Sequence, residues 1–330
     1  MTRTNNAEPF DLLNEVQGCR TIGVSGHIRP DGDCVGSCMA VSLYIQKALP
    51  GTRVDVFLDD FPESLRRNIA GSEQILPRRA TEVASYDAFI VCDCESGRLG
   101  DALPIFRAAK KKINIDHHET NPGTGDVCYV VPKASSACEL VYHTLRGELI
   151  DERIARNLYI GMVTDTGVFA YSNTSRQTME IAGRLIEYGF DFSAIVREVF
   201  YEKTMVQQQM LGTALQNARL HLGGRCLVSM IDRHIIAAHH AGSKDMDGIA
   251  AELVHTYGVC CVIFMYEIAP GRFKLSLRST GEVDVAKVAA GVGGGGHARA
   301  SGVTMDASYE TIVAKLLPPI EAQLKAGVHV

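Results

Sequence analysis

Carboxylate and imidazole side chains gather in four short clusters of this sequence. Asp116-His117-His118 follows a β-branched stretch at 113–115, and the other clusters are 27–33 (HIRPDGD), 92–94 (CDC) and 164–167 (TDTG). Carboxylate oxygen suits hard divalent ions, and imidazole nitrogen adds a ligand for manganese or iron. Such a set can hold two divalent metal ions, and it predicts a hydrolase of phosphoesters.

The six candidate ligands can be divided between two ions. We assign His27 and Asp31 to one ion, Asp33, His117 and Asp165 to the other, and Asp93 to a bridging position. Two ions roughly 3.5 to 4 Å apart stabilise the attacking and leaving oxygens of an in-line displacement and lower the pKa of a bound water. None of the six ligands is a thiolate, so the set favours manganese over zinc or copper.

Each cluster alone has an ordinary structural explanation. Pro30-Asp31-Gly32-Asp33 is typical of a turn, Asp116-His117-His118 of a surface loop, and 165–167 of a helix terminus. All four clusters, however, lie at the ends of predicted strands or helices. A shared metal site explains that placement better than unrelated turns.

The first half of the chain alternates short apolar runs with amphipathic stretches. Predicted strands are 21–25, 54–58, 88–92 and 113–115; predicted helices include 35–49, 64–69, 135–145 with a serine N-cap, and 152–163. This βαβ rhythm is typical of a parallel sheet in an α/β fold. Ligands of such sheets bind outside the carboxyl ends of the strands, where His27, Asp93 and His117 fall.

The second half predicts a separate, smaller α/β domain. A chain of 330 residues exceeds the usual size of one core, so two domains are expected. Strands are predicted at 220–231, interrupted by Gly223-Gly224 as in a hairpin, and at 260–268 and 272–277, with a closing helix at 309–325. We therefore expect domains at 1–190 and 217–330, joined by a polar helical linker at 191–216.

Composition and charge limit the partners. Hydrophobic residues make up 46% of the chain and charged residues 22%, which is ordinary for a soluble globular protein. The net charge of −5 argues against a broad surface for long duplex DNA, whereas a small phosphorylated substrate is compatible. No signal-peptide pattern or membrane-spanning apolar run occurs, so we expect a cytoplasmic protein. The ten cysteines show neither a disulfide framework nor zinc-ribbon spacing, and we expect most of them to be buried packing residues.

A glycine-rich segment at 291–296 (GVGGGG), with an unbroken glycine run at 293–296 and His297 after it, is open to several interpretations. It formally matches G-x-G-x-x-G, but it lacks the surrounding βαβ unit of a dinucleotide fold and the Lys-Ser/Thr of a P-loop. Consecutive glycines let backbone N–H groups approach an anion; the alternative is a flexible tight turn. Arg278, at the end of a predicted strand, is either a bidentate phosphate contact or an ordinary surface residue.

The order of these motifs resembles the DHH phosphoesterase superfamily over nearly the whole chain. The residues that carry the resemblance are His27, Pro30, Asp31, Gly32, Asp33, Asp93, Asp116, His117, His118 and Asp165. Residues 293–297 (GGGGH) and 300–302 (ASG) resemble the associated C-terminal DHHA1 domain. The resemblance implies a two-manganese site in the first domain, substrate contacts from the second, and an active site in the cleft between them.

Site roles follow from the resemblance by matching position. It implies metal ligands at His27, Asp31, Asp33, Asp93, His117 and Asp165, with Mg²⁺ or Co²⁺ as substitutes for the two Mn²⁺. The implied catalytic residues are Asp93 and His118. The implied substrate contacts are His118, Arg278, Ser279, Gly294, Gly295, Gly296 and His297. Ala170 departs from the pattern, because many relatives carry Arg or a polar residue there.

Length and domain content favour the nanoRNase branch. RecJ-type exonucleases are longer, and family II pyrophosphatases carry a Ser-Arg-Lys-Lys signature that this chain replaces with Leu277-Arg278-Ser279 and the glycine run. The resemblance implies hydrolysis of short single-stranded oligoribonucleotides to mononucleotides, and of 3′-phosphoadenosine 5′-phosphate to AMP. Alternatives are a manganese-dependent pyrophosphatase, a linear dinucleotide (pApA-type) phosphodiesterase and a catalytically silent nucleotide-binding protein. A homodimer is left open.

Overall fold

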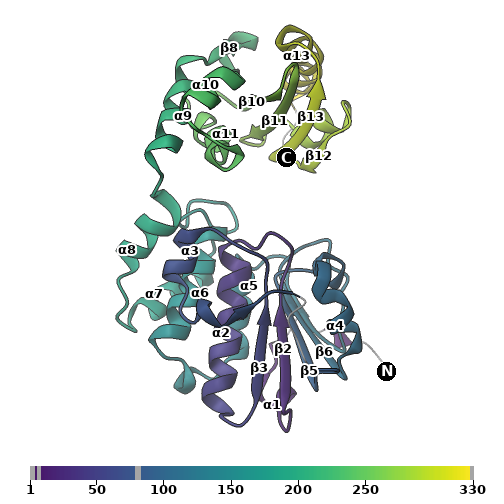
Figure 1. Ribbon diagram of the computed structural model, residues 1–330, viewed down its shortest axis with the longest axis vertical. Coiled ribbons are helices and arrows are strands. Elements are labelled where there is room, and N and C mark those ends of the chain that lie inside the picture. Colours follow the sequence, from purple (N-terminus) through teal and green to yellow (C-terminus); the bar gives the residue numbers. More distant parts are fainter. Residues whose placement is uncertain (1–3, 6–8, 79–82, 328–330) are drawn as a thin grey trace. The chain divides into compact units, whose positions relative to one another are not determined.

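The computed structural model describes residues 4–5, 9–78 and 83–327. The chain divides into two compact units, Met1–Glu202 and Lys203–Val330 (Figure 1). The stretch predicted as a helical linker, 191–216, is not one helix. It contains α8 (Phe192–Val196), a π-helical turn (Arg197–Tyr201) and α9 (Met205–Gln216). Thr204 and Gln207 form a capping box that starts α9, so the helical stretch is interrupted at 202–204.

The first unit is built on a seven-stranded sheet in which every pairing is parallel. The strand order is β1-β7-β6-β5-β2-β3-β4. The strands are β1 (Thr4–Asn5), β2 (Thr21–Ser25), β3 (Arg53–Phe57), β4 (Ile75–Leu76), β5 (Ala88–Cys92), β6 (Lys111–Asp116) and β7 (Val127–Val130). The predicted strands at 21–25 and 88–92 match β2 and β5 residue for residue, and the predicted parallel α/β fold is confirmed.

The helices of the first unit are α1 (Leu12–Val16), α2 (Gly32–Ala48), α3 (Glu63–Asn68), α4 (Leu103–Ala108), α5 (Ala137–Thr144), α6 (Glu152–Asp165), α7 (Arg176–Ile186) and α8. Helix α2 contacts β2, β3 and β5 as well as α5 and α6, so it is buried over residues 32–45. The helix predicted at 135–145 with a serine N-cap is α5, which begins at Ala137; its N-cap is Ser136, whose hydroxyl accepts a hydrogen bond from the Glu139 N–H. This packing fixes α2, α5 and α6, which carry ligand candidates or hold them in place.

The second unit contains a six-stranded mixed sheet of order β12-β13-β11-β10-β9-β8, in which only the β9–β10 pairing is parallel among the described residues. The strands are β8 (Arg219–His221), β9 (Cys226–Ile231), β10 (Cys261–Ala269), β11 (Arg272–Ser279), β12 (Gly295–His297) and β13 (Ala300–Asp306). The predicted hairpin at 220–231 is β8–β9. The glycine run, for which no strand was predicted, contributes the edge strand β12.

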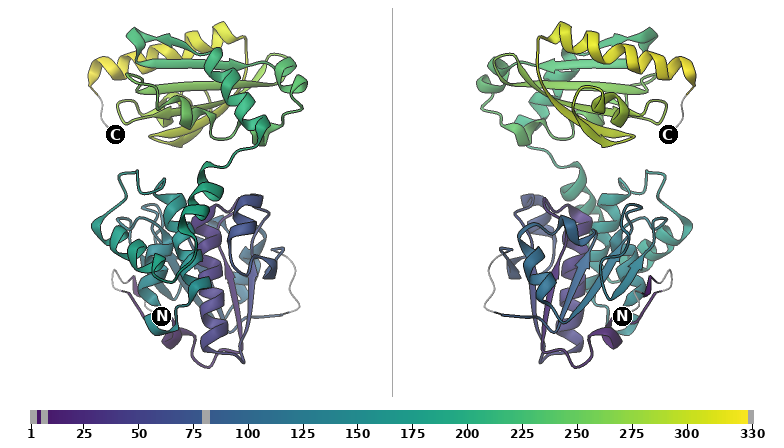
Figure 2. Two further views of the ribbon diagram at one scale, coloured as in Figure 1. Left: turned by 90° about the vertical axis from the view of Figure 1, so that its left-hand side faces the viewer. Right: turned by 90° about the vertical axis from the view of Figure 1, so that its right-hand side faces the viewer.

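Helices cover both faces of this second sheet. They are α9, α10 (Arg233–Ala238), α11 (Ile249–Leu253), α12 (Val285–Ala290) and α13 (Tyr309–Ala326). One apolar core includes residues of α12 and α13, the other residues of α9 and α11, and Figure 2 shows α13 in yellow along its side of the sheet. The predicted smaller α/β domain is thus confirmed.

Two further expectations concern cysteines and membranes. All ten cysteines are free thiols, and only Cys19 is not fully buried, which agrees with packing rather than a disulfide framework. Within the described ranges, no helix has both the length and the apolar character needed to span a lipid bilayer.

Candidate metal centre

The four motif clusters meet at the carboxyl edge of the first sheet. His27 lies two residues after β2, Asp93 directly after β5 and His117 directly after β6, while α6 ends at Asp165. Within each of three groups the ligand atoms lie within 4.8 Å of one another: Asp93, Asp116, His117 and His118; His27, Cys34 and Asp93; Asp33, His117 and Asp165. Because the groups share Asp93 and His117, they form one continuous site.

Asp93 lies at the centre of this site. Its Oδ2 is 3.3 Å from His27 Nε2, and its Oδ1 is 3.4 Å from His117 Nε2. The side chain is buried, and Oδ1 accepts no hydrogen bond from any described residue. A buried carboxylate oxygen without a hydrogen bond is unfavourable, but it has free lone pairs of the kind that a bridging metal ligand needs. The residues therefore fit a pair of divalent cations.

Backbone strain also concentrates here. Six non-glycine residues in the described ranges have positive φ, and four of them lie within four residues of a candidate ligand: Arg29, Asp93, Val168 and Phe169. Asp93 itself has φ 60°, and its N–H donates to the Ile115 carbonyl at 2.9 Å. Such conformations cost of order 1–3 kcal/mol each and persist where the surroundings enforce them. The strain is consistent with a site whose side chains must point in fixed directions.

Asp33, His117 and Asp165 form the group that we predicted for one ion. His117 Nε2 lies 3.9 Å from Asp33 Oδ2 and 3.6 Å from Asp165 Oδ2. Both Asp33 oxygens accept backbone hydrogen bonds at the start of α5, from Ala137 N–H at 2.6 Å and Cys138 N–H at 2.9 Å. The amino end of α5 thus orients Asp33 and partly compensates its charge.

Negative charge accumulates in this group. Burial, followed by the charges of Asp93 and Asp165, raises the pKa of Asp33 well above its usual range. Burial also raises the pKa of Asp165 to about 6. For His117, burial lowers the pKa, but the three carboxylates outweigh it and raise the value to about 10. Crowded carboxylates of this kind are stabilised by a bound cation.

His27 and Asp31 form the other predicted pair. His27 Nδ1 lies 2.8 Å from the Ile28 carbonyl oxygen and donates its proton to it, which leaves Nε2 as the ring nitrogen that faces the site. Nε2 lies 3.7 Å from Asp31 Oδ2. The other Asp31 oxygen caps α2 by accepting from the N–H groups of Asp33 and Cys34. One carboxylate thus combines helix capping with a ligand position.

Asp116 and His118 form a hydrogen-bonded pair beside the candidate ligands. Asp116 is fully buried, and its oxygens accept from His118 Nδ1 at 2.7 Å and from Asn121 Nδ2 at 2.6 Å. His118 is half-buried, and its Nδ1 is 3.7 Å from Asp93 Oδ1. Asp116 is thus occupied in orienting the His118 ring.

Cys34 is a site residue that the sequence analysis assigned to packing. Its thiol belongs to the same group of ligand atoms as His27 and Asp93, and the residue is fully buried. The available signal was spacing: Cys34 lies three residues after Asp31, at the first turn of α2, where neighbouring side chains share a face. A soft sulfur atom therefore lies beside ligands that are otherwise oxygen and nitrogen.

In the second unit, Arg278 and Ser279 end β11. Arg278 is half-buried and its Nη1 donates to the Leu277 carbonyl at 2.9 Å. The buried Ser279 hydroxyl oxygen accepts from the N–H groups of Gly281 and Val283, so it caps the following turn. Both residues lie where the sequence predicted, but Ser279 already has a structural task.

The glycine run forms a turn at 291–293 and then enters the edge strand β12 at Gly295. The N–H groups of Gly293 and Gly294 donate to the carbonyls of Ala290 and Ala289 at the end of α12. A Cβ on Gly294 would lie 2.5 Å from the Gly302 oxygen, so close packing against β13 requires glycine here. Two of the amides considered for anion binding are therefore occupied, while His297 is exposed.

The fold and site together define an α/β protein with a candidate two-metal centre at the carboxyl edge of a parallel sheet. Residues 21–162 match the model of the DHH family, N-terminal domain, and residues 223–325 match the DHHA1 domain. The chain therefore belongs to the DHH/DHHA1 phosphoesterase superfamily, as its motifs indicated.

Several known proteins are similar along most of their length. The "Bifunctional oligoribonuclease and PAP phosphatase NrnA" of Thermus thermophilus is 28% identical over 92% of this chain and 90% of the relative. A crystal structure of an exopolyphosphatase-related protein from Bacteroides fragilis matches with a TM-score of 0.84 and 25% identity, covering 95% of both chains. The structure of exonuclease RecJ bound to manganese matches with a TM-score of 0.51 at 15% identity, which shows a shared fold.

Proposed function

We propose that this protein is a metal-dependent phosphoric ester hydrolase that degrades short oligoribonucleotides and dephosphorylates 3′-phosphoadenosine 5′-phosphate. The observation that carries the chemistry is the Asp93 carboxylate, buried between two imidazoles with one oxygen free of hydrogen bonds. The substrate class rests on the relatives: the name of the Thermus thermophilus protein, aligned over nearly the whole chain, states both activities.

Six residues would hold two Mn²⁺ ions, for which Mg²⁺ or Co²⁺ could substitute. They are His27, Asp31, Asp33, Asp93, His117 and Asp165. Two such ions, when bound, supply a water of lowered pKa and neutralise charge on the reacting phosphoryl group. Manganese accepts this mixture of carboxylate and imidazole.

His118 would act on the substrate rather than on a metal. Asp116 binds its Nδ1 proton at 2.7 Å, which leaves Nε2 as the ring atom that can contact a phosphate oxygen. Because Asp116 is fully buried and accepts several hydrogen bonds, the ring orientation is fixed before substrate arrives. Such preorganisation saves the cost of ordering the side chain during reaction.

The second unit would supply the substrate contacts. The guanidinium of Arg278 has the donor geometry for a phosphate, and His297 offers an exposed ring for hydrogen bonding or stacking. Ser279 and Gly294, Gly295 and Gly296 complete the proposed contact set. With few cations available and a net charge of −5, the protein can neutralise few phosphates at once. Short substrates should therefore be preferred.

A substrate panel with added Mn²⁺ tests this proposal. Dinucleotides, five-nucleotide RNA and 3′-phosphoadenosine 5′-phosphate should be hydrolysed much faster than a 20-nucleotide RNA or pyrophosphate, and chelation with EDTA should abolish all activity. Equal rates on long and short RNA would contradict the substrate class. Phosphate release from pyrophosphate alone would instead make the protein a pyrophosphatase, and full activity in EDTA would exclude the metal mechanism.

A further inference from the structure

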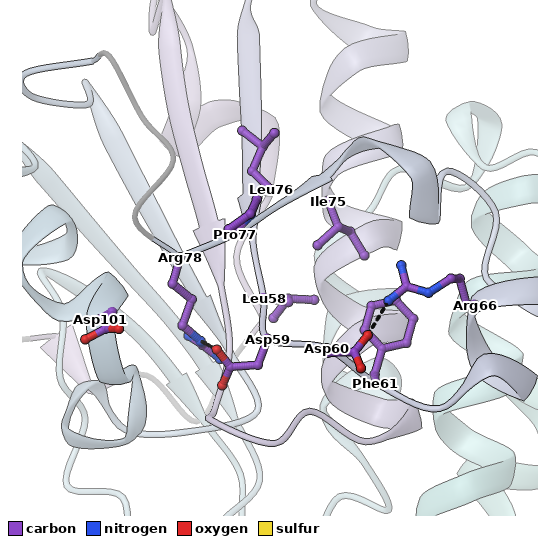
Figure 3. Close-up of a pocket in the computed structure, with 10 residues that line it drawn as sticks. All are labelled: Leu58, Asp59, Asp60, Phe61, Arg66, Ile75, Leu76, Pro77, Arg78 and Asp101. Atoms are coloured by element: carbon purple, nitrogen blue, oxygen red, sulfur yellow. Dashed lines mark hydrogen bonds and ion pairs between the residues drawn. The ribbon is translucent and has the colours of Figure 1, made fainter.

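A buried arginine, Arg78, follows β4 and lies beside the His27 loop. It lines a cavity of about 630 Å³ on the first unit, together with Asp59, Asp60 and Arg66 (Figure 3). Only 5% of Arg78 is exposed. A guanidinium so deeply buried is unfavourable by several kcal/mol unless its donors are satisfied. Its contacts should therefore explain its presence.

Five hydrogen bonds satisfy this guanidinium. Its acceptors are Asp59 Oδ1 at 2.7 Å, Ser25 Oγ at 3.1 Å, and the carbonyl oxygens of Gly26 at 3.1 Å, His27 at 2.6 Å and Leu99 at 2.8 Å. Figure 3 shows the bond between Arg78 and Asp59. Three loops, after β2, after β3 and after β5, are thus tied to one side chain.

Two of these carbonyls flank the His27 Cα. The Gly26 carbonyl belongs to the peptide before it and the His27 carbonyl to the peptide after it, so Arg78 holds both peptide planes. The second peptide is also held at its other end, because the Ile28 N–H donates to the Arg98 carbonyl at 2.9 Å. The backbone on either side of the ligand candidate is fixed.

The orientation of the backbone passes to the ring. His27 Nδ1 donates to the Ile28 carbonyl at 2.8 Å; this carbonyl belongs to the Ile28–Arg29 peptide, the one directly after the two peptides that Arg78 holds, so the plane of the imidazole depends on the backbone at Ile28. The Nε2 atom on the opposite side of the ring then faces Asp93 and Asp31. Arg78 therefore acts on the His27 ring through its hydrogen bonds to the His27 backbone, the covalent chain at Ile28 and the hydrogen bond of Nδ1.

We propose that Arg78 is a positioning residue that sets the metal affinity of the centre through His27. This inference rests on the proposed metal-dependent function but concerns a residue outside the ligand motifs. Lysine at this position could keep the pairing with Asp59, but its compact ammonium cannot hold three carbonyls in the fork geometry of a guanidinium. Loss of a residue that orients a metal ligand typically weakens metal affinity or activity by roughly 10- to 100-fold.

The test is Mn²⁺ titration of the full-length Arg78→Lys protein by calorimetry, without substrate. The Mn²⁺ dissociation constant should rise roughly 10- to 100-fold, and turnover of a dinucleotide should recover when Mn²⁺ is raised to saturation. The matched control is Arg66→Lys: Arg66 lines the same cavity but pairs with Asp60 at 2.8 Å and lies over Phe61. Its metal affinity should be unchanged.

Specific outcomes would overturn the inference. One is a Mn²⁺ affinity of Arg78→Lys equal to that of the wild type. A second is an equal loss of Mn²⁺ affinity in Arg66→Lys, and a third is dinucleotide turnover of Arg78→Lys that stays low at saturating Mn²⁺. If Arg78→Lys does not fold, Asp59→Asn replaces it, since Asp59 is partly exposed and contacts the guanidinium through Nε. That variant should weaken Mn²⁺ binding in the same direction, and unchanged affinity would refute the proposal. Wild-type protein that binds Mn²⁺ but cleaves no substrate would refute the proposed function alone.

Discussion

The candidate residues of the two units are held in different ways. In the first unit, Asp33, Asp93 and His27 are exposed by only 1%, 2% and 5%, and hydrogen bonds or backbone strain fix their directions. In the second unit, Arg278 is half-buried and His297 is exposed. Buried charges need exact partners, whereas surface groups can be ordered by the ligand itself. The first unit should therefore determine whether reaction occurs, and the second how well substrate binds.

The largest expected effect tests the first half of this comparison. Asp93→Asn removes the central negative charge, so the metal is lost or misplaced and turnover should fall well beyond the roughly 10- to 100-fold typical of residues that only orient ligands. The control is Asp87→Asn, just before β5, where the carboxylate binds Lys110 at 2.7 Å. Metal analysis and dinucleotide turnover measure both variants. Near-normal turnover in Asp93→Asn would contradict the idea that the first unit determines whether reaction occurs.

An intermediate effect is expected at Arg278. A charge-assisted hydrogen bond to phosphate contributes about 1.5–3 kcal/mol, so Arg278→Ala should lower kcat/KM on dinucleotides by roughly ten- to a hundredfold. Manganese content and the slow hydrolysis of bis-p-nitrophenyl phosphate should change much less. Arg272→Ala, on the same strand and 3.7 Å from Asp306, is the matched control. Equal loss on both substrates, or loss of manganese, would mean that Arg278 serves the metal centre.

The smallest effect is expected at His297. A neutral hydrogen bond contributes about 0.5–1.5 kcal/mol, so His297→Ala should lower kcat/KM on dinucleotides about two- to tenfold, mainly through KM. His255→Ala, at another exposed histidine of the second unit, should have no effect. Steady-state kinetics distinguish the two. A His297→Ala variant that instead loses kcat at saturating substrate would place this ring in the chemical step.

The sequence predicted the elements whose signal is local. β2 and β5 are buried apolar runs, and their bounds were predicted without error. β6 begins two residues before the predicted strand, because its first residues, Lys111 and Lys112, are charged and do not belong to an apolar run. β12 was not predicted, because glycine has low strand propensity. The break before α9 had a signal in the Thr204–Gln207 capping box, which the polar helical pattern around it obscured.

The sequence predicted the candidate metal ligands, but it did not predict the residues that hold those ligands in position. Ligand motifs can be recognised in a sequence by residue type and spacing. The structure brings all six predicted ligands to one edge of the sheet. Arg78 has no such motif, because four of its five acceptors are backbone carbonyls or a hydroxyl from distant parts of the chain. The left-handed φ of Asp93 is likewise set by tertiary contacts, since aspartate itself does not require it.

The crowding of Asp33, Asp93 and Asp165 has a consequence for the lifetime of the protein. Burial and the neighbouring carboxylates raise the pKa values of Asp33 and Asp165, and Asp93 Oδ1 accepts no hydrogen bond, so an ion that binds only the folded chain would compensate the charge of this group. By mass action, an ion present at 100 times its dissociation constant adds about 2.7 kcal/mol to the free energy of unfolding. Metal supply would thereby govern resistance to proteolysis, and metal starvation would shorten the survival of the folded chain.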